Sequence, residues 1–321
     1  MSDAAQTAVL LLAHGSPDRP EDVPEFLRNV TGGRPLPPDV VAEIQRRYAL
    51  IGRSPLTEIT VRQAALLARD LELPVYAGMR NWNPFIADVL RQMSADGVQR
   101  VVALCLAPQN SRTSVGLYRQ AAMSESGPRF ERFEFIESWH DHPLLIRAFA
   151  QRLESGWKRA CDELGARKPI LYTAHSVPAR TILEGDPYEV QTRETAALVA
   201  MALPALTVDD WTFAFQSQGM SGGPWIGPTV EDTILALKKK GHRGVFLQPI
   251  GFVCDHVEVL YDIDVAFREF AARQGMNLWR AGSLNDSPIF IAALADVVRS
   301  RLEPAEPAQP LVQIAKPPVT P

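Results

Sequence analysis

The chain has 321 residues, of which 46% are hydrophobic and 22% charged, proportions typical of a soluble globular protein with room for two domains. Its formal net charge is −4 with acids and bases interspersed, which excludes the extended basic surface of a nucleic-acid-binding protein. The first residues lack a basic segment and the apolar run 9–13 is too short for a signal sequence or a transmembrane segment, so we expect a cytoplasmic protein. Three cysteines without Cys-x-x-Cys spacing predict neither a disulfide framework nor an iron–sulfur cluster.

Short apolar runs alternate with helical patterns along the chain. A continuous apolar run bounded by turn residues is typical of a strand buried on both faces, so we predict an α/β fold with parallel sheets flanked by helices. The predicted strands are 9–13, 74–77, 101–106, 133–136, 170–173, 212–215, 245–249 and one around Leu278. The predicted helices include 84–95, 143–161, 188–201, 230–240 and 288–302.

Two parts of the chain resemble each other. Residues 83–90 and 227–234 match at an offset of 144 (227 − 83), and the segments around His14 and His175 match at an offset of 161 (175 − 14). Repetition in the same order predicts two similar doubly wound lobes with a cleft between them, in which His14 and His175 occupy equivalent strand ends. Glu258 then corresponds to Ser114. The two sides of the cleft therefore have equivalent backbones but different functional side chains.

We place the N-terminal lobe at residues 1–145 and the C-terminal lobe at 146–302, with a last helix that can pack back on the N-terminal lobe. Residues 19–39 are rich in proline and contain Gly32-Gly33, which predicts a long loop of the lid or binding type. Residues 303–321 are again rich in proline and predict a disordered tail.

The segment 249–264 runs from an apolar strand through a glycine turn into an acid-rich helix. If Asp255 caps that helix, Glu258 and Asp262 lie on one face, and Asp255 can extend the row. Carboxylates so spaced suit a hard or borderline cation, although the same pattern fits a solvated acidic face.

His175 and His14 each follow a predicted buried strand. A neutral imidazole at such a strand end can take a proton or bind a metal, whereas the structural alternative is a histidine hydrogen-bonded within the turn. Together with Glu258 and Asp262, His175 suits a reaction that removes protons and places a cation. No His-x-His or His-Glu-x-x-His motif is present, so a transient metal substrate fits better than a stored metal.

Basic and aromatic residues suggest what else the cleft binds. Arg46, Arg47 and Arg80, with Tyr48 and Trp82, can receive the carboxylates of a planar acidic ligand and stack on its rings. Arg46 and Arg47 equally fit ordinary surface charges on a helix. No Walker loop is present, so nucleotide binding is only weakly supported.

Several motifs, in order, resemble the signatures of ferrochelatases. They are Thr173-Ala-His-Ser-Val-Pro178, Gln216-Ser-Gln-Gly219, Pro224-Trp-Ile-Gly-Pro228 with Glu231-Asp232, and Pro249-Ile-Gly-Phe-Val-Cys-Asp-His-Val-Glu-Val-Leu-Tyr261. Gly15-Ser-Pro-Asp18 and Tyr48-Ala-Leu-Ile-Gly-Arg-Ser-Pro-Leu56 extend the resemblance, which covers about residues 8–302. The segment 33–38 and the short tail are more similar to coproporphyrin-type than to protoporphyrin-type enzymes.

The resemblance implies a lyase of haem biosynthesis that inserts Fe(II) into a porphyrin, here coproporphyrin III to give coproheme, and releases two pyrrole protons. It implies that His175 accepts a proton or contacts the metal, that Glu258 is the facing carboxylate, and that Asp262 is an outer metal ligand. Which of His175 and Glu258 takes the protons stays open. The substrate-binding residues that it suggests are His14, Arg47, Ser54, Arg80, Thr113 and Tyr118.

Iron and porphyrin are substrates in this reading, and we expect no tightly bound cofactor and no iron–sulfur cluster. We also expect a monomer without a transmembrane segment, with at most transient contacts to other enzymes of haem biosynthesis. The alternatives are a protoporphyrin IX ferrochelatase, cobalt insertion into a sirohydrochlorin-like ring, and a two-lobed protein that carries tetrapyrrole or metal without catalysis.

Three positions differ from the pattern of the family. His14 stands where coproporphyrin-type enzymes often carry a tyrosine, and we expect it to face the iron opposite His175. Ala266 and Asn81 stand where some relatives carry a glutamate and a histidine, which argues against the outer metal sites of those relatives.

Overall fold

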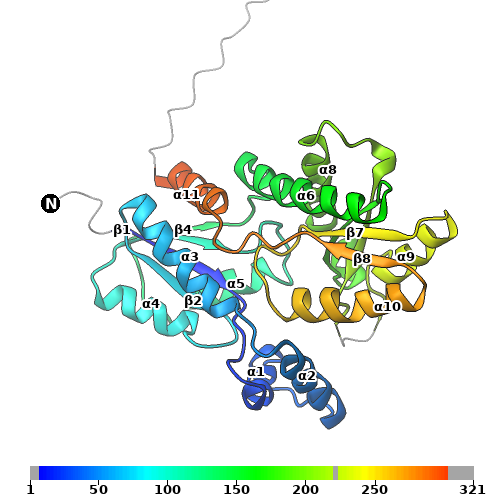
Figure 1. The fold of residues 1–321 in the computed structure, drawn as a ribbon. Coiled ribbons are helices and arrows are strands. Elements are labelled where there is room, and N and C mark those ends of the chain that lie inside the picture. The colour runs from blue at the N-terminus through cyan, green and yellow to red at the C-terminus, as the bar shows by residue number, and fades with distance from the viewer. Residues whose placement is uncertain (1–6, 220–222, 303–321) are drawn as a thin grey trace, which may run out of the picture.

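The computed structural model describes residues 7–219 and 223–302, which form two parallel four-stranded sheets (Figure 1). The first sheet has the order β2-β1-β3-β4 and the second the order β6-β5-β7-β8. The strands are β1 (Thr7–Ala13), β2 (Val75–Met79), β3 (Arg100–Cys105), β4 (Arg132–Ile136), β5 (Ile170–His175), β6 (Trp211–Gln216), β7 (Gly244–Pro249) and β8 (Asn277–Arg280). This architecture confirms the predicted α/β fold with two similar lobes.

Helices cover the faces of both sheets, as parallel strands require. In the N-terminal lobe they are η2 (Pro20–Asp22), α1 (Val23–Val30), α2 (Pro38–Ile51), α3 (Leu56–Leu71), α4 (Ile86–Ala95) and α5 (Val115–Ala122). The helices that follow are α6 (Pro143–Leu164), α7 (Ala179–Leu183), α8 (Tyr188–Met201), η3 (Val208–Asp210), α9 (Val230–Lys239), η4 (Glu258–Phe267), α10 (Arg268–Arg273) and α11 (Pro288–Leu302). Every residue of β1 and of β7 is buried, which explains why the sequences of both strands are mostly apolar.

The two lobes share local geometry as well as strand order. One backbone hydrogen bond closes each central strand: Leu106 N donates to Leu12 O at 2.9 Å, and Ile250 N donates to Thr173 O at 2.8 Å. A second bond ties each neighbouring strand to the repeated proline: Met79 N to Pro84 O at 2.7 Å, and Phe215 N to Pro228 O at 2.8 Å. Leu12 and Thr173 keep the offset of 161, and Leu106/Ile250 and Pro84/Pro228 keep the offset of 144. Met79 and Phe215 lie 136 residues apart (215 − 79), because the connection from the strand to the repeated proline is longer in the second lobe. The sequence repeat therefore corresponds to a repeated strand-helix-strand structure.

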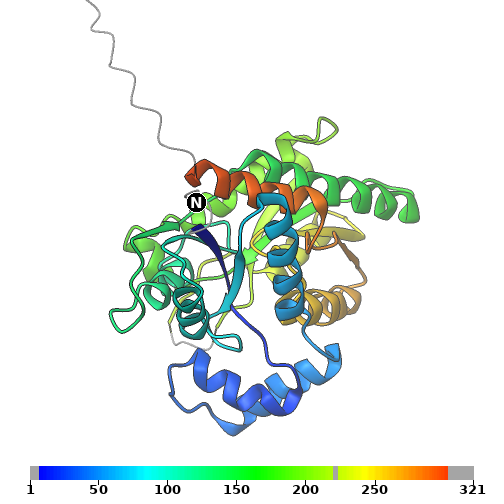
Figure 2. The same ribbon diagram turned by 90° about the vertical axis from the view of Figure 1, so that its left-hand side faces the viewer.

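One hydrophobic cluster runs through both lobes on the side of α3, α6 and α11. It includes Leu11 of β1, Phe149 of α6, Tyr172 of β5 and Leu294 of α11, all buried. Helix α11 packs against both α3 and α6, and Figure 2 shows it lying across one end of α3. The lobes are therefore joined by a common core on this side.

The segment 19–39, predicted as a proline-rich loop, differs from that expectation. It contains η2, all of α1 and the start of α2, and a proline occupies the first turn of each of these helices. Amide hydrogens in the first turn of a helix make no hydrogen bond within the helix, and proline has no amide hydrogen. Proline is therefore favoured at the start of a helix, although it disrupts a helix interior. In Figure 1, α1 and α2 lie together beneath the two sheets.

Two further expectations meet the limits of the structure. The predicted disordered tail, 303–321, lies outside the described residues. Within residues 7–219 and 223–302, no helix combines the length and the apolar character needed to cross a membrane.

Gly251 allows the end of β7 to approach β5 closely, just before His175. A Cβ atom on Gly251 would lie 2.8 Å from Ala174 Cβ and 3.0 Å from Ala174 Cα. We expect Gly251→Ala to lower the free energy of unfolding by about 1–3 kcal/mol through overpacking. The matched control is Gly282→Ala, whose added Cβ would meet no atom within 4 Å and should change stability by about 0.5 kcal/mol or less. Denaturant unfolding checks both, and equal effects would contradict the packing argument.

Candidate active site

The two repeated histidines follow the central strands and are held in the same way. His14 Nδ1 lies 3.1 Å from Gly15 O, and His175 Nδ1 contacts Ser176 O. A carbonyl oxygen only accepts, so in each ring Nδ1 carries the hydrogen and Nε2 points elsewhere. The backbone therefore presents the Nε2 atom of both imidazoles as the reactive nitrogen.

Glu258 lies between two histidines at the start of η4, which is a π-helix. Its Oε1 atom is 3.5 Å from His175 Nε2, and its Oε2 atom is 3.6 Å from His256 Nε2. His256 is oriented in turn by its Nδ1 atom, 2.9 Å from Cys254 O. The side chains of His175 and Glu258 are 33% and 32% exposed, so both are partly accessible to solvent.

Asp255 does not cap the helix, contrary to the prediction. Its carboxylate accepts hydrogen bonds from Ser283 Oγ at 2.7 Å and Asn285 Nδ2 at 2.8 Å, and it pairs with Arg280 at 3.4 Å. Helical backbone begins at Val257 without a side-chain cap. The carboxylate of Asp255 is thus bound by these three residues and not by the helix. The acidic row consists of Glu258 and Asp262.

His175 and Glu258 form the central pair of the site, and their charges stabilise each other. Burial alone would lower the pKa of His175, but the nearby Glu258 carboxylate outweighs burial and raises that pKa to about 9. Burial likewise opposes ionisation of Glu258, yet His175 and His256 hold its pKa well below the ordinary value. At neutral pH the unliganded site therefore holds an imidazolium at His175 and a carboxylate at Glu258.

His14 has the opposite electrostatic environment. Burial and the neighbouring Arg80 guanidinium lower its pKa to about 4, so His14 is neutral at physiological pH. Arg80 lies over the ring of buried Tyr118, 5.6 Å from its centroid, and burial raises the pKa of that phenol. The N-terminal lobe thus contributes a neutral imidazole, a cation and a neutral phenol.

Asp262 lies one helical turn beyond Glu258 and is bound to protein groups. Its Oδ2 atom accepts a hydrogen bond of 2.5 Å from Ser217 Oγ, and its Oδ1 atom is 3.6 Å from Arg47 Nη1. Burial and the charge of Glu258 raise its pKa to about 6. These contacts make Asp262 a bridge between β6, η4 and α2.

Helix α2 reaches over η4 through two adjacent arginines. Arg46 Nη2 donates to Tyr261 Oη at 2.7 Å, and the Arg47 guanidinium lies 4.9 Å from the centroid of the Tyr261 ring. Glu43 pairs with both arginines at 2.8 and 3.0 Å. The structure therefore assigns Arg46 and Arg47 to the contact between α2 and the acidic helix.

The remaining predicted substrate-binding residues lie in different surroundings. Ser54 is buried, and its Oγ atom has no hydrogen-bond partner in the described structure. Arg80 Nε and the amide nitrogen of the adjacent Asn81 are also buried without a partner there. Thr113 is exposed and its hydroxyl lies 2.9 Å from Ser111 Oγ.

Aromatic residues near His175 were not singled out from the sequence. Trp225 and Phe252 flank the imidazole, with ring centroids 6.5 and 6.4 Å away. Buried Tyr188 lies within hydrogen-bonding reach of the His175 backbone. Trp225 and Phe252 stand inside recognisable motifs, but the sequence around Tyr188 offered no comparable signal.

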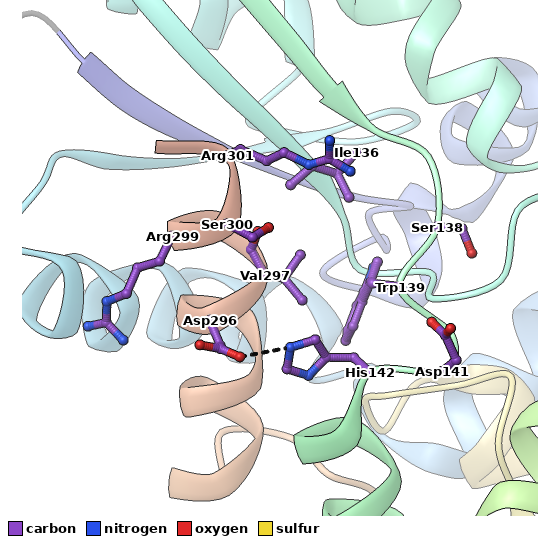
Figure 3. Close-up of a pocket in the computed structure, with 10 residues that line it drawn as sticks. All are labelled: Ile136, Ser138, Trp139, Asp141, His142, Asp296, Val297, Arg299, Ser300 and Arg301. Atoms are coloured by element: carbon purple, nitrogen blue, oxygen red, sulfur yellow. Dashed lines mark hydrogen bonds and ion pairs between the residues drawn. The ribbon is translucent and has the colours of Figure 1, made fainter. Parts of the chain in front are cut away.

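A cavity of about 320 Å³ lies between α11 and the connection from β4 to α6 (Figure 3). It is lined by ten residues, none of them a predicted site residue: Ile136, Ser138, Trp139, Asp141, His142, Asp296, Val297, Arg299, Ser300 and Arg301. His142 is paired with Asp296 at 3.1 Å, and Arg299 with Asp70 at 2.5 Å. The candidate active site is therefore the group of His175, Glu258 and His14, which lies apart from this cavity. In the described parts of the chain, no group of three or more His, Cys, Asp or Glu side chains is arranged to hold a metal ion.

Comparison with known protein families identifies relatives along almost the whole chain. The family model described as Ferrochelatase matches residues 6–302. A protein named Ferrochelatase from Acidobacterium capsulatum is 53% identical, with 95% of this chain and 98% of that protein covered. A protein named Coproporphyrin III ferrochelatase from Geobacillus sp. is 34% identical, with 92% of this chain and 97% of that protein covered.

Solved structures with the same fold are more distant in sequence. SirB from Bacillus subtilis, solved with Fe³⁺, superposes with a TM-score of 0.55 at 11% identity, covering 92% of this chain and 95% of that chain. CbiX, described as the terminal enzyme of sirohaem biosynthesis in denitrifying bacteria, superposes with a TM-score of 0.54 at 15% identity and covers 92% of this chain and 99% of that chain. At these identities the likeness establishes the fold alone.

The pairing of His175 with Glu258 can be tested by its pKa. With Glu258→Gln, the charge that raises the pKa is removed and burial remains, so the pKa of His175 should fall from about 9 to below 6.5. NMR titration of the His175 ring protons, assigned with His175→Ala, measures this change. Asp296→Asn, which removes the partner of His142, is the matched control and should leave His175 unaffected. A pKa that stays near 9 in Glu258→Gln would refute the pairing.

Proposed function

Because this chain belongs to the ferrochelatase family and is a porphyrin metal chelatase of haem biosynthesis, we propose that it inserts Fe(II) into coproporphyrin III to give coproheme. Several relatives that are 31–34% identical over most of the chain are named Coproporphyrin III ferrochelatase, which supports this choice. The observation that carries it is a set of buried donors that have no acceptor in the described structure.

Coproporphyrin III has four propionate groups, whereas protoporphyrin IX has two propionates and two vinyl groups. A site for the former needs more positive charge and more hydrogen-bond donors. Arg80 Nε, Ser54 Oγ and the side-chain amide nitrogen of Asn81 are buried without a hydrogen-bond partner among the residues that the structure describes. Buried donors without acceptors are costly, so this set favours an acidic ligand that supplies the acceptors.

Glu258 is the proposed acceptor of the first pyrrole proton. In the unliganded site His175 carries a proton and its pKa is raised to about 9, so its imidazolium has no lone pair to offer at Nε2. Glu258 is ionised, and its side chain is partly accessible to solvent. Its negative charge also attracts the ferrous ion, and His175 can bind a proton or the metal only after losing its own proton. Both pyrrole protons leave the porphyrin as iron binds. Glu258 accepts each proton in turn and releases it to solvent, because its side chain is 32% exposed and the low pKa of its carboxyl disfavours keeping the proton.

His14 is the proposed group on the opposite side of the porphyrin. It is neutral at physiological pH, and its Nδ1 atom is bound to Gly15 O, which leaves Nε2 free to face the ring. The site would then offer a carboxylate from one lobe and a neutral nitrogen from the other. The position of iron between these two groups is the expectation tested below.

The substrate is tested by anaerobic addition of Fe(II) to coproporphyrin III or protoporphyrin IX, following the loss of the free-base absorption spectrum. We expect kcat/KM to be higher for coproporphyrin III, and we expect His175→Ala to lower kcat by about 100-fold or more, the usual cost of losing an acid–base group. His142→Ala is the matched control, because that histidine lies in the separate cavity.

The outcomes separate the alternatives. A higher kcat/KM for protoporphyrin IX would refute the coproporphyrin proposal while leaving iron chelation intact. Insertion of Co(II) into a sirohydrochlorin ring but of Fe(II) into neither porphyrin would favour the second alternative. Equal rates with protein and with buffer would leave only a carrier.

His14 is tested by the visible spectrum of the ferrous product complex. A histidine ligand or close neighbour changes the iron ligand field, so His14→Ala should shift the absorption bands of bound coproheme. His142→Ala should not shift them. Identical spectra of the wild type and His14→Ala would rule out a contact between His14 and iron.

A further inference from the structure

Gln216 lies at the junction between the strand of His175 and the helix of Glu258. It ends β6, where it stands in register with His175 of the neighbouring strand β5. Its side chain is 2% exposed, so both ends of its amide need partners within the protein. Those partners connect the two halves of the central pair.

The side chain of Gln216 spans from β5 to η4. Its Oε1 atom accepts a hydrogen bond of 2.7 Å from Thr173 Oγ1, two residues before His175. Its Nε2 atom donates to the backbone carbonyl of Glu258 at 3.1 Å. One rigid amide group therefore links the strand that carries the histidine to the residue that carries the carboxylate.

The backbone of Gln216 acts on the histidine itself. Ser176 N donates to Gln216 O at 2.7 Å, and the carbonyl of Ser176 accepts the hydrogen bond from His175 Nδ1. The orientation of the His175 ring thus depends on the backbone of Ser176, which Gln216 holds through the Ser176 N–H. The next residue, Ser217, has a left-handed φ of 58° and places its hydroxyl against Asp262.

We propose that Gln216 is a positioning residue that sets the separation between His175 and Glu258. This inference rests on the proposed function, in which those two side chains meet the porphyrin and iron. Their 3.5 Å separation leaves little tolerance, because a displacement of about 1 Å at a reacting group can cost about 100-fold in rate.

The position equivalent to Gln216 has different contacts in the N-terminal lobe, so the role proposed for Gln216 does not follow from the fold alone. Ala13 pairs with Met79 as Ala174 pairs with Phe215, so Arg80 is the counterpart of Gln216. Leu12 is the counterpart of Thr173 and has no hydroxyl to anchor an amide. The described residues of that lobe, 7–145, contain no acidic π-helix, and its strand-end residue lies beside His14 instead.

The test compares two buried glutamines of the same sheet. Gln216→Leu keeps the size of the side chain and removes its three hydrogen bonds, to Thr173 Oγ1, to the Glu258 carbonyl and, at 3.3 Å, to Ser217 Oγ. Gln248→Leu makes the same change in β7, where the side chain is 1% exposed and donates only to the adjacent Pro249 O at 3.3 Å. We expect Gln216→Leu to lower kcat for iron insertion by about 10- to 100-fold, with KM for the porphyrin and its dissociation constant within about twofold of the wild type. Gln248→Leu should leave kcat within about twofold even where its melting temperature falls equally.

A double-mutant cycle with Thr173→Val tests the proposed link. If Gln216 acts through Thr173, the double variant should be no slower than Gln216→Leu alone, because both changes break one chain of hydrogen bonds. Rate losses that multiply would overturn the link, as would equal losses of kcat in Gln216→Leu and Gln248→Leu.

The crystal structure of Gln216→Leu supplies a readout that does not depend on turnover. The distance from His175 Nε2 to Glu258 Oε1 should exceed that in the wild type, and an unchanged distance would overturn the proposal. Failure of the wild-type protein to insert iron would instead refute the proposed function and leave this comparison of distances valid.

Discussion

The carboxylate of Glu258, between the imidazoles of His175 and His256, is the interaction on which the site depends. An ionised carboxylate in a partly buried position is unfavourable unless charges and hydrogen bonds compensate it. Here the compensation comes from two rings that are each oriented by a backbone carbonyl, at Ser176 and Cys254. The backbone turns at Ser176 and Cys254 orient the two rings. This orientation in turn determines the charge state of His175 and Glu258.

Duplication explains how two such different surfaces come to face one cleft. Equivalent strand ends place His14 and His175 at corresponding points of the two lobes. One lobe adds burial and Arg80, which leave its histidine neutral, and the other adds Glu258, which charges its histidine. A flat tetrapyrrole between the lobes would meet a neutral nitrogen on one face and a carboxylate on the other. Such asymmetry suits a reaction in which a cation enters and two protons leave.

The α1–α2 unit connects this cleft to its surroundings. A small core that includes Phe26, Tyr48 and Trp82 holds the unit together and places Phe26 beside His14, with 5.7 Å between ring centroids. Arg46 and Arg47 join it to Tyr261 and Asp262 of η4. These arginines contact the same helix that carries Glu258. A propionate that pairs with Arg47 would therefore act directly on the contacts of that helix.

The sequence by itself determined the α/β class, all eight strands, the duplication and the family, because buried parallel strands are continuous apolar runs and the motifs follow them directly. It also indicated His175, Glu258 and His14 as residues of one cleft. Only the tertiary structure decided that Asp255 turns toward Arg280, that the acidic helix is a π-helix, and that the prolines of 19–39 start helices. These features depend on partners distant in the chain, such as Ser283 for Asp255 and Gln216 for the carbonyl of Glu258, and local patterns of residues carry no information about such contacts.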